Sequence, residues 1–249
     1  MERHSSKDLA DQRVVVVGGT SGMGRGTVAA AVRAGAHVIS AGRRPFAERR
    51  RVDAPAGAVD EELVDVTDEA SVRALFDRVA TLDHLVVTAA PAPGPSAAFQ
   101  TSDVAQLRKY LDDKLMGSLA CARWAAPRMR VGGSITFVTG VAAIKPRAGM
   151  ALVSVAFAAV EALARALAVE LAPLRTNAIR PGFIDSDMWS FLDEQARQGL
   201  RDRVRAKFPV GRAGSVDDIS EAALFLMTSS YVTGTVLEVT GGEQFVDAF

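Results

Sequence analysis

Cysteine is almost absent from this sequence, since Cys121 is the single example among 249 residues. An internal disulfide is therefore excluded, and the composition favours a reducing compartment, which predicts a cytoplasmic protein. We expect Cys121 itself to be a small buried hydrophobe on a helix. An excess of charge is absent too, because 29 lysines and arginines balance 29 aspartates and glutamates. Nothing in this balance indicates nucleic acid as a partner.

A long uninterrupted hydrophobic run is also missing. The first twelve residues are polar and show no apolar core of a secretion signal. The longest weakly polar stretch, residues 148–160, ends at Glu161 and is too short to span a bilayer. We therefore expect this stretch to be a helix buried against protein, and we expect no membrane partner.

The sequence does contain a regular alternation of short β-branched runs and longer Ala-, Leu- and Arg-rich segments of helical period. Apolar strands separated by helices predict a parallel sheet covered on both faces. Right-handed crossovers then predict an α/β fold, with one doubly wound domain over residues 1–249 and a polar tail at residues 1–10. The expected strands are residues 14–17, 38–40, 63–66, 85–88, 135–138, 176–179 and 236–239.

A glycine-rich turn joins the first expected strand to a helix, with Gly18, Gly22 and Gly24 in a Gly-x-x-x-Gly-x-Gly spacing. Gly18 permits the tight turn, Gly22 lets the backbone approach a pyrophosphate, and Gly24 lets the helix pack closely. The alternative is a tight turn without a ligand. We predict a dinucleotide site of the Rossmann type, formed here by Gly18, Thr20, Ser21, Gly22, Met23 and Gly24.

The end of the second expected strand indicates which dinucleotide binds. Arg43 and Arg44 follow Gly42, and no carboxylate stands there to hold ribose hydroxyls. A guanidinium grips a phosphate bidentately, whereas a carboxylate would repel it, so NADP(H) is favoured over NAD(H). The alternative is that both arginines belong to a solvated basic stretch over residues 43–51.

The glycine spacing is followed along the chain by Pro181-Gly182 and Gly241-Gly242. In these motifs the chain resembles the short-chain dehydrogenase/reductase family between about residues 11 and 246. The resemblance implies that Asp65 meets the adenine edge and that the loop after the sixth strand holds the nicotinamide carboxamide. Asp65 has the alternative role of a helix cap with Thr67 or Asp68. The positions implied as cofactor contacts are Asp65, Val66, Ala89, Pro181, Gly182 and Ile184.

The family's catalytic unit of Asn, Ser, Tyr and Lys is changed at every position. In the family, Tyr exchanges a proton with the substrate oxygen, Lys lowers the pKa of that Tyr and holds the ribose, Ser polarises the carbonyl, and Asn anchors a water. The two tyrosines of this chain, Tyr110 and Tyr231, lie outside the expected active-site helix, so we expect neither to replace the missing donor. The corresponding residues here are Lys114, Gly140, Val153 and Phe157.

Three polar side chains are candidates to replace the missing groups. Lys114 brings an ammonium near the usual relay water, and a buried lysine can be tuned as an acid or base. Thr139 keeps a hydroxyl one residue before the lost serine, and Lys145 lies on the loop after the fifth expected strand. Each has the alternative of a solvated or capping role. We place Lys114 first, and we expect no metal site.

These observations leave three hypotheses for function. The first is an NADP(H)-dependent oxidoreductase of non-standard mechanism, which acts on a carbonyl or alcohol of a small apolar molecule. The second is a catalytically inactive NADP(H)-binding sensor, regulator or partner subunit, and the third is a non-redox dehydratase or isomerase. Loops around residues 91–95 and 183–207 are expected to set the substrate. The helix after residue 150 resembles the family's dimerising helix and implies a homotetramer or homodimer.

Overall fold

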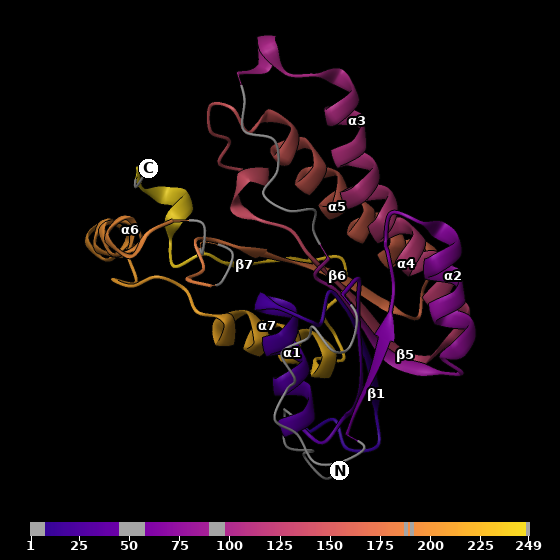
Figure 1. Ribbon diagram of the computed structural model, residues 1–249. Helices are drawn as coiled ribbons and strands as arrows, with labels where there is room; N and C mark the ends of the chain where they lie inside the picture. The colour runs from indigo at the N-terminus through magenta and orange to yellow at the C-terminus, as the bar shows by residue number, and fades with distance from the viewer. Residues whose placement is uncertain (1–7, 45–57, 90–97, 187–188, 190–191, 248–249) are drawn as a thin grey trace.

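The computed structural model describes residues 8–44, 58–89, 98–186, 189 and 192–247. Seven parallel strands form one sheet in the order β3-β2-β1-β4-β5-β6-β7, which confirms the predicted doubly wound fold (Figure 1). The loop at residues 91–95 lies outside the described residues. The strands are β1 (Arg13–Val17), β2 (His37–Gly42), β3 (Val59–Leu63), β4 (Leu82–Val87), β5 (Met129–Val138), β6 (Arg175–Pro181) and β7 (Val236–Val239).

The third strand differs from the prediction, because β3 ends at Leu63 instead of beginning there. The prediction of a strand at residues 63–66 is therefore wrong. As the edge strand, β3 pairs only with β2, so its acidic side chains stay at least partly exposed and its pattern is not a continuous apolar run. The apolar residues after Leu63 instead lead into the turn before the next helix.

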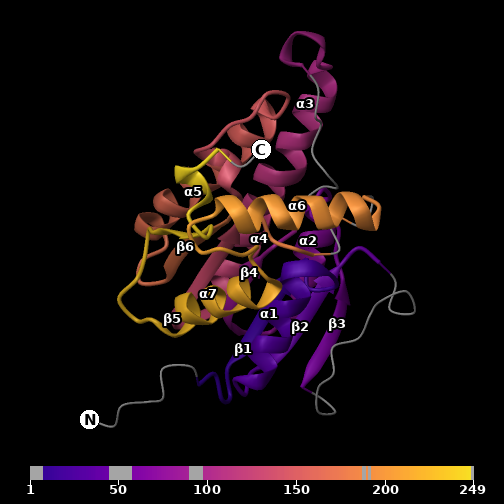
Figure 2. The same ribbon diagram turned by 90° about the vertical axis from the view of Figure 1, so that its left-hand side faces the viewer.

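Helices cover both faces of the sheet. In Figure 1, α1 and α7 lie on one side of the strands, with α2 and α4 on the other. The helix α3 continues into α4 through one π turn, Asp112–Met116, while α6 lies across the upper front of the view in Figure 2. The helices are α1 (Gly22–Arg33), α2 (Glu69–Arg78), α3 (Val104–Leu111), α4 (Gly117–Ala125), α5 (Ala151–Glu170), α6 (Glu194–Lys207) and α7 (Val216–Thr228).

The strand β1 shows how the two apolar layers form. Val15 and Val17 pack into the cluster under α2, α4 and α5, whereas Val14 and Val16 pack into the cluster under α1 and α7. This alternation follows from the two-residue period of a strand buried on both faces. The strand order reverses between β1 and β4, so their carboxyl ends border the crevice where ligands bind in such sheets. Cys121 is free and buried on α4, as predicted.

The helix α5 has 20 residues and is, by length and composition, apolar enough to cross a membrane. A single such helix is weak evidence, since a helix packed in a protein core has the same composition. In this fold Val160 and Ala164 pack against the sheet, and Glu161 forms a buried ion pair with Arg180 on β6. The helix therefore serves as a layer of the domain, as the sequence predicts, but it begins at Ala151 instead of residue 148 and continues to Glu170.

Candidate functional site

The glycine-rich turn packs closely against the end of β4. A Cβ on Gly18 would lie 2.5 Å from Thr88 Oγ1 and 2.7 Å from Ala89 N, and one on Gly24 would lie 2.1 Å from Gly18 O. Larger residues at these two positions would displace the backbone. Gly22 has a φ of +49°, and among the described atoms nothing lies within 4 Å of where its Cβ would stand. The turn thus leaves open space over the start of α1.

The N-terminus of α1 presents its amide groups to this space. Ser21 is the N-cap residue but makes no side-chain capping hydrogen bond, so no capping side chain occupies the first-turn amides. Thr20 stands beside the end of β2, because a Cβ on Gly42 would lie 2.9 Å from Thr20 Oγ1. Met23 packs against the α1–α7 layer. Open space, free amides and close glycine packing fit a pyrophosphate.

The ends of β2 and β3 meet beside this turn. Arg43 and Arg44 are exposed there, and the rest of the basic stretch at residues 43–51 lies outside the described residues. The pKa of Asp65 is lowered, first by the hydrogen bond from the Thr67 amide and also by the nearby positive charge of Arg43. Asp65 Oδ1 accepts bonds from Thr67 N at 3.0 Å and Thr67 Oγ1 at 2.8 Å. Asp65 therefore closes a turn with Thr67, whereas the N-cap of α2 is Asp68, which accepts a bond from Ala70 N at 2.9 Å. The exposed guanidiniums of Arg43 and Arg44 fit a phosphate.

The loop after β6 begins at Gly182, directly after Pro181 ends the strand. Gly182 N donates to Val239 O at 3.0 Å, and a Cβ on Gly182 would lie 2.8 Å from Thr240 Cα, so the loop lies tight against the end of β7. Ile184 is buried and pairs with Gly214 through an isolated bridge. On the other side of the crevice, Val66 approaches the start of α4. These contacts hold the loop at the carboxyl edge of the sheet.

Lys114 lies in the π turn between α3 and α4 and is only 1% exposed. Its Nζ donates to Ala89 O at 3.0 Å and to Val138 O at 2.8 Å, just after β4 and at the end of β5. Burial lowers the pKa of Lys114 to about 8. An ammonium has three N–H donors, and two of them have partners within the described chain. Lys114 therefore places a titratable cation at the edge of the sheet where the cofactor crevice opens.

Phe157 occupies the space beside Gly140. A Cβ on Gly140 would lie 2.6 Å from Phe157 Cε2, so a serine would not fit there while the phenyl ring stays in place. Lys114 Nζ lies 5.8 Å from the centroid of the same ring. Val153 is buried against Ala142 in the neighbouring apolar cluster. The changes at positions 114, 140 and 157 thus form one packed arrangement.

Tyr110 is the residue that sequence reasoning missed. Tyr110 does lie outside the active-site helix, since it is on α3, but it packs in one cluster with Val153 and Phe157 of α5. Within the described chain its hydroxyl makes no hydrogen bond, and burial raises the pKa of Tyr110 to about 12. A signal was available, since Tyr110 and Lys114 are four residues apart in the order Tyr-x-x-x-Lys, but on α3 and the π turn instead of α5.

Thr139 and Lys145 have structural partners. Thr139 Oγ1 lies 3.0 Å from Glu161 Oε1 and 3.1 Å from Ile179 O. Lys145 Nζ donates to Glu243 O at 2.8 Å and also to Val246 O. Both side chains thus hold neighbouring segments together. Of the three candidates from the sequence, Lys114 is the buried ammonium that lies at the cofactor crevice.

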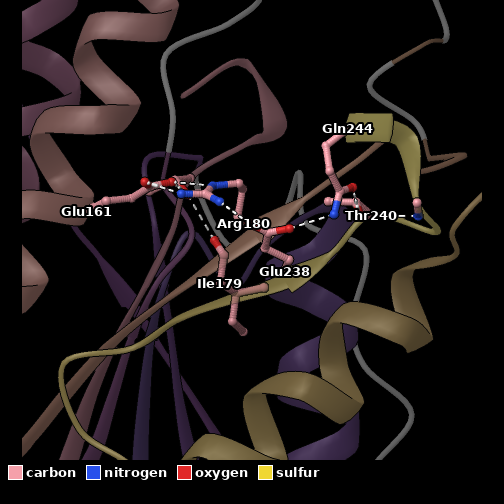
Figure 3. A network of polar contacts seen from close by, with 8 residues as sticks. Glu161, Ile179, Arg180, Glu238, Thr240 and Gln244 are labelled. Atoms are coloured by element: carbon pink, nitrogen blue, oxygen red, sulfur yellow. Dashed lines mark hydrogen bonds and ion pairs between the residues drawn. The ribbon is translucent and has the colours of Figure 1, made fainter. Parts of the chain in front are cut away.

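A polar network links α5 to the C-terminal segment (Figure 3). Arg180 binds both carboxylate oxygens of Glu161, with Nε at 2.9 Å and Nη2 at 2.6 Å, and also pairs with Glu238. Gln244 Nε2 donates to Glu238 Oε2 at 2.6 Å, and Thr240 binds Gln244 in turn. Removal of one partner from a buried pair costs about 3–5 kcal/mol. The network therefore fixes α5, β6 and β7 relative to one another.

A reversed strand order, a glycine turn at a helix N-terminus and two arginines after β2 together define a dinucleotide-binding α/β protein. Among the described residues, no group of three or more His, Cys, Asp or Glu side chains could hold a metal ion. The family model described as "Enoyl-(Acyl carrier protein) reductase" matches residues 17–244. The chain belongs to the short-chain dehydrogenase/reductase family.

Relatives cover nearly the whole chain. The short-chain dehydrogenase/reductase ucsE of Acremonium sp is 30% identical over 270 residues, covering 97% of this chain and 98% of its own. A small-chain dehydrogenase solved in complex with NADPH has a TM-score of 0.77, 30% identity, and coverage of 94% and 99%. A short-chain oxidoreductase of Pseudomonas aeruginosa PAO1, described as containing an atypical catalytic center, has a TM-score of 0.84, 29% identity, and coverage of 94% and 98%.

Proposed function

We propose that this protein is an NADP(H)-dependent oxidoreductase that acts on a carbonyl or alcohol of a small apolar molecule without the family's usual catalytic unit. Lys114 carries the proposal, since it is a buried ammonium with a pKa of about 8 at the carboxyl ends of β4 and β5. Bound NADPH would supply the hydride. The exposed guanidiniums of Arg43 and Arg44, and a related structure in complex with NADPH, support the choice of cofactor.

In this mechanism the Lys114 ammonium would donate its proton to the oxygen of a carbonyl substrate as that carbonyl is reduced. The Ala89 and Val138 carbonyls hold the amine in place, and the neutral amine regains its proton from water. The ring of Phe157, whose centroid lies 5.8 Å from Nζ, covers one side of the ammonium. The oxidation of an alcohol runs in the opposite sense, with neutral Lys114 as the base.

A second candidate function is a catalytically inactive NADP(H)-binding sensor or partner subunit. The packing of Phe157 against Gly140 favours it, because the ring fills space beside the usual serine position. Calorimetric titration with NADPH, followed by a turnover assay on a broad carbonyl panel, separates the two. Binding without turnover on any substrate would favour the second function, and absence of binding would contradict both.

We predict that NADPH binds at least about tenfold more tightly than NADH, which corresponds to roughly 1.4 kcal/mol. Arg43 and Arg44 stand exposed at the end of β2 with no carboxylate after Gly42 to hold ribose hydroxyls. The substitution Arg43→Asp is expected to abolish or reverse the preference, because a carboxylate repels the 2′-phosphate. Calorimetry with both cofactors measures this, and equal affinities in the unmodified protein would contradict the assignment.

We also predict a homo-oligomer, a tetramer or a dimer, that covers the outer face of α5. Val155 and Val169 are 55% and 79% exposed on this helix, and exposed Ala162 lies seven residues from each. An apolar stripe of this kind is typical of an interface between copies. Light scattering at micromolar concentration should show more than one copy, and Ala162→Arg should reduce the mass. A monomer in the unmodified protein would refute the prediction.

A further inference from the structure

Glu243 is a buried carboxylate near the end of the chain, only 1% exposed, in the short turn η7 (Glu243–Phe245). Both of its oxygens are used. Oε1 accepts a hydrogen bond from Arg147 Nη2 at 2.6 Å, and Oε2 accepts one from Phe183 N at 2.6 Å. The second bond joins the C-terminal turn to the loop that follows β6.

The carboxylate meets that loop at two successive residues. Besides the bond from the Phe183 amide, Oε2 would lie 2.8 Å from a Cβ on Gly182, so only glycine leaves room for this approach. Gly182 N in turn donates to Val239 O at 3.0 Å. The peptide between Gly182 and Phe183 therefore lies between the end of β7 and the Glu243 carboxylate.

The turn that carries Glu243 is itself held from two sides. Lys145 Nζ binds the carbonyl oxygens of Glu243 and Val246, and Lys145 comes from the loop before α5. On the other side, Gln244 binds Glu238 of β7 (Figure 3). Glu243 thus connects the loop before α5 with the loop after β6, the two segments that border the proposed cleft.

The charge of Glu243 is balanced by these neighbours. Burial raises the pKa of Glu243, while the Phe183 amide and the cations of Arg147 and Lys145 act in the opposite direction. A buried carboxylate with a charge-assisted bond to a backbone amide holds that amide more firmly than a neutral acceptor would.

We propose that Glu243 is a positioning residue for the nicotinamide half of the cofactor, because it holds the backbone of the loop after β6 in the shape that receives the carboxamide. This inference rests on the proposed function, together with the family resemblance, which implies that this loop holds the nicotinamide carboxamide. The adenosine half would be held by the glycine turn and Arg43, whereas the contacts of Glu243 among the described residues are with Arg147, Phe183, Lys145 and its own turn. Loss of Glu243 should therefore weaken the binding of the nicotinamide half of the cofactor and leave the binding of the adenosine half unchanged.

The test compares two ligands on Glu243→Ala by calorimetry. NADPH carries the nicotinamide, whereas 2′,5′-ADP carries only the phosphorylated adenosine. We expect the Kd for NADPH to rise at least about tenfold while the Kd for 2′,5′-ADP stays within about twofold. A parallel weakening of both ligands would indicate a general structural defect and overturn the inference, as would an unchanged Kd for NADPH.

Two further variants sharpen the experiment. Asp77→Asn changes a carboxylate of α2 that pairs with Arg128, in segments separate from the turn of Glu243 and the loop after β6, and it should leave the Kd for NADPH within about twofold. If Glu243→Ala does not fold, Glu243→Gln replaces it, with an expected rise of about threefold in the Kd for NADPH alone. Failure of the unmodified protein to bind NADPH would instead contradict the proposed function, so the two failures are distinguishable.

Discussion

Replacement of Lys114 by alanine should lower the rate of NADPH-dependent reduction by about 10²-fold or more, the usual effect of losing a positioned general acid. Lys114 is a buried ammonium that binds Ala89 O and Val138 O, and its pKa is lowered to about 8 by burial. Since the protonated form donates the proton, the rate of reduction should fall as the pH rises through about 8. Steady-state kinetics on the best substrate of the carbonyl panel measure both effects.

Two variants serve as controls for Lys114. Lys109→Ala removes an exposed lysine that pairs with Asp113 close by in the chain, and it should change the rate less than about twofold. Tyr110→Phe removes the hydroxyl that lies in the cluster with Val153. If Tyr110→Phe lowers the rate of reduction more than Lys114→Ala does, Tyr110 is the proton donor instead of Lys114. Unchanged turnover in Lys114→Ala would contradict the proposed mechanism.

Restoration of the family's catalytic unit should succeed only as a whole. The quadruple change Lys114→Asn, Gly140→Ser, Val153→Tyr and Phe157→Lys is expected to raise turnover of ordinary ketones by about 10²-fold or more, while each single change should do little. The packing gives the reason, because a Cβ on Gly140 would lie 2.6 Å from Phe157 Cε2. Turnover assays of the single and quadruple variants measure this directly.

The same contact predicts an effect on stability. Gly140→Ser alone should destabilise the fold by about 1–3 kcal/mol, as overpacking of a filled core does. Gly140→Ser combined with Phe157→Ala should recover part of that loss, because the smaller side chain frees the space. A double-mutant cycle on denaturant unfolding measures the coupling. Additive effects of the two changes on the free energy of unfolding would contradict the contact between Gly140 and Phe157. Efficient reduction of ordinary ketones by the unmodified protein would contradict the description of the catalytic site.

Local patterns in the sequence determined most of the architecture. Continuous valines before Gly18 predict a buried parallel strand, and the glycine spacing predicts the turn over the start of α1, because both depend on residues adjacent in the chain. The same reasoning did not predict the bounds of the edge strand β3. Three of the five residues of Val59–Leu63 are acidic, all five are at least partly exposed, and pairing with β2 makes them a strand.

The contents of the cleft depended on contacts between residues far apart in the chain. Lys114 is identifiable from the sequence as a changed position, but its burial, which lowers its pKa, and its bonds to carbonyls on two other segments appear only in the folded chain. Tyr110 joins Val153 because α3 packs beside α5, and Glu243 reaches Phe183 across 60 residues. Contacts between residues far apart in the chain leave no periodic pattern in the sequence, so neighbouring residues do not reveal them. Only the packed fold decides which polar groups lie at the cleft.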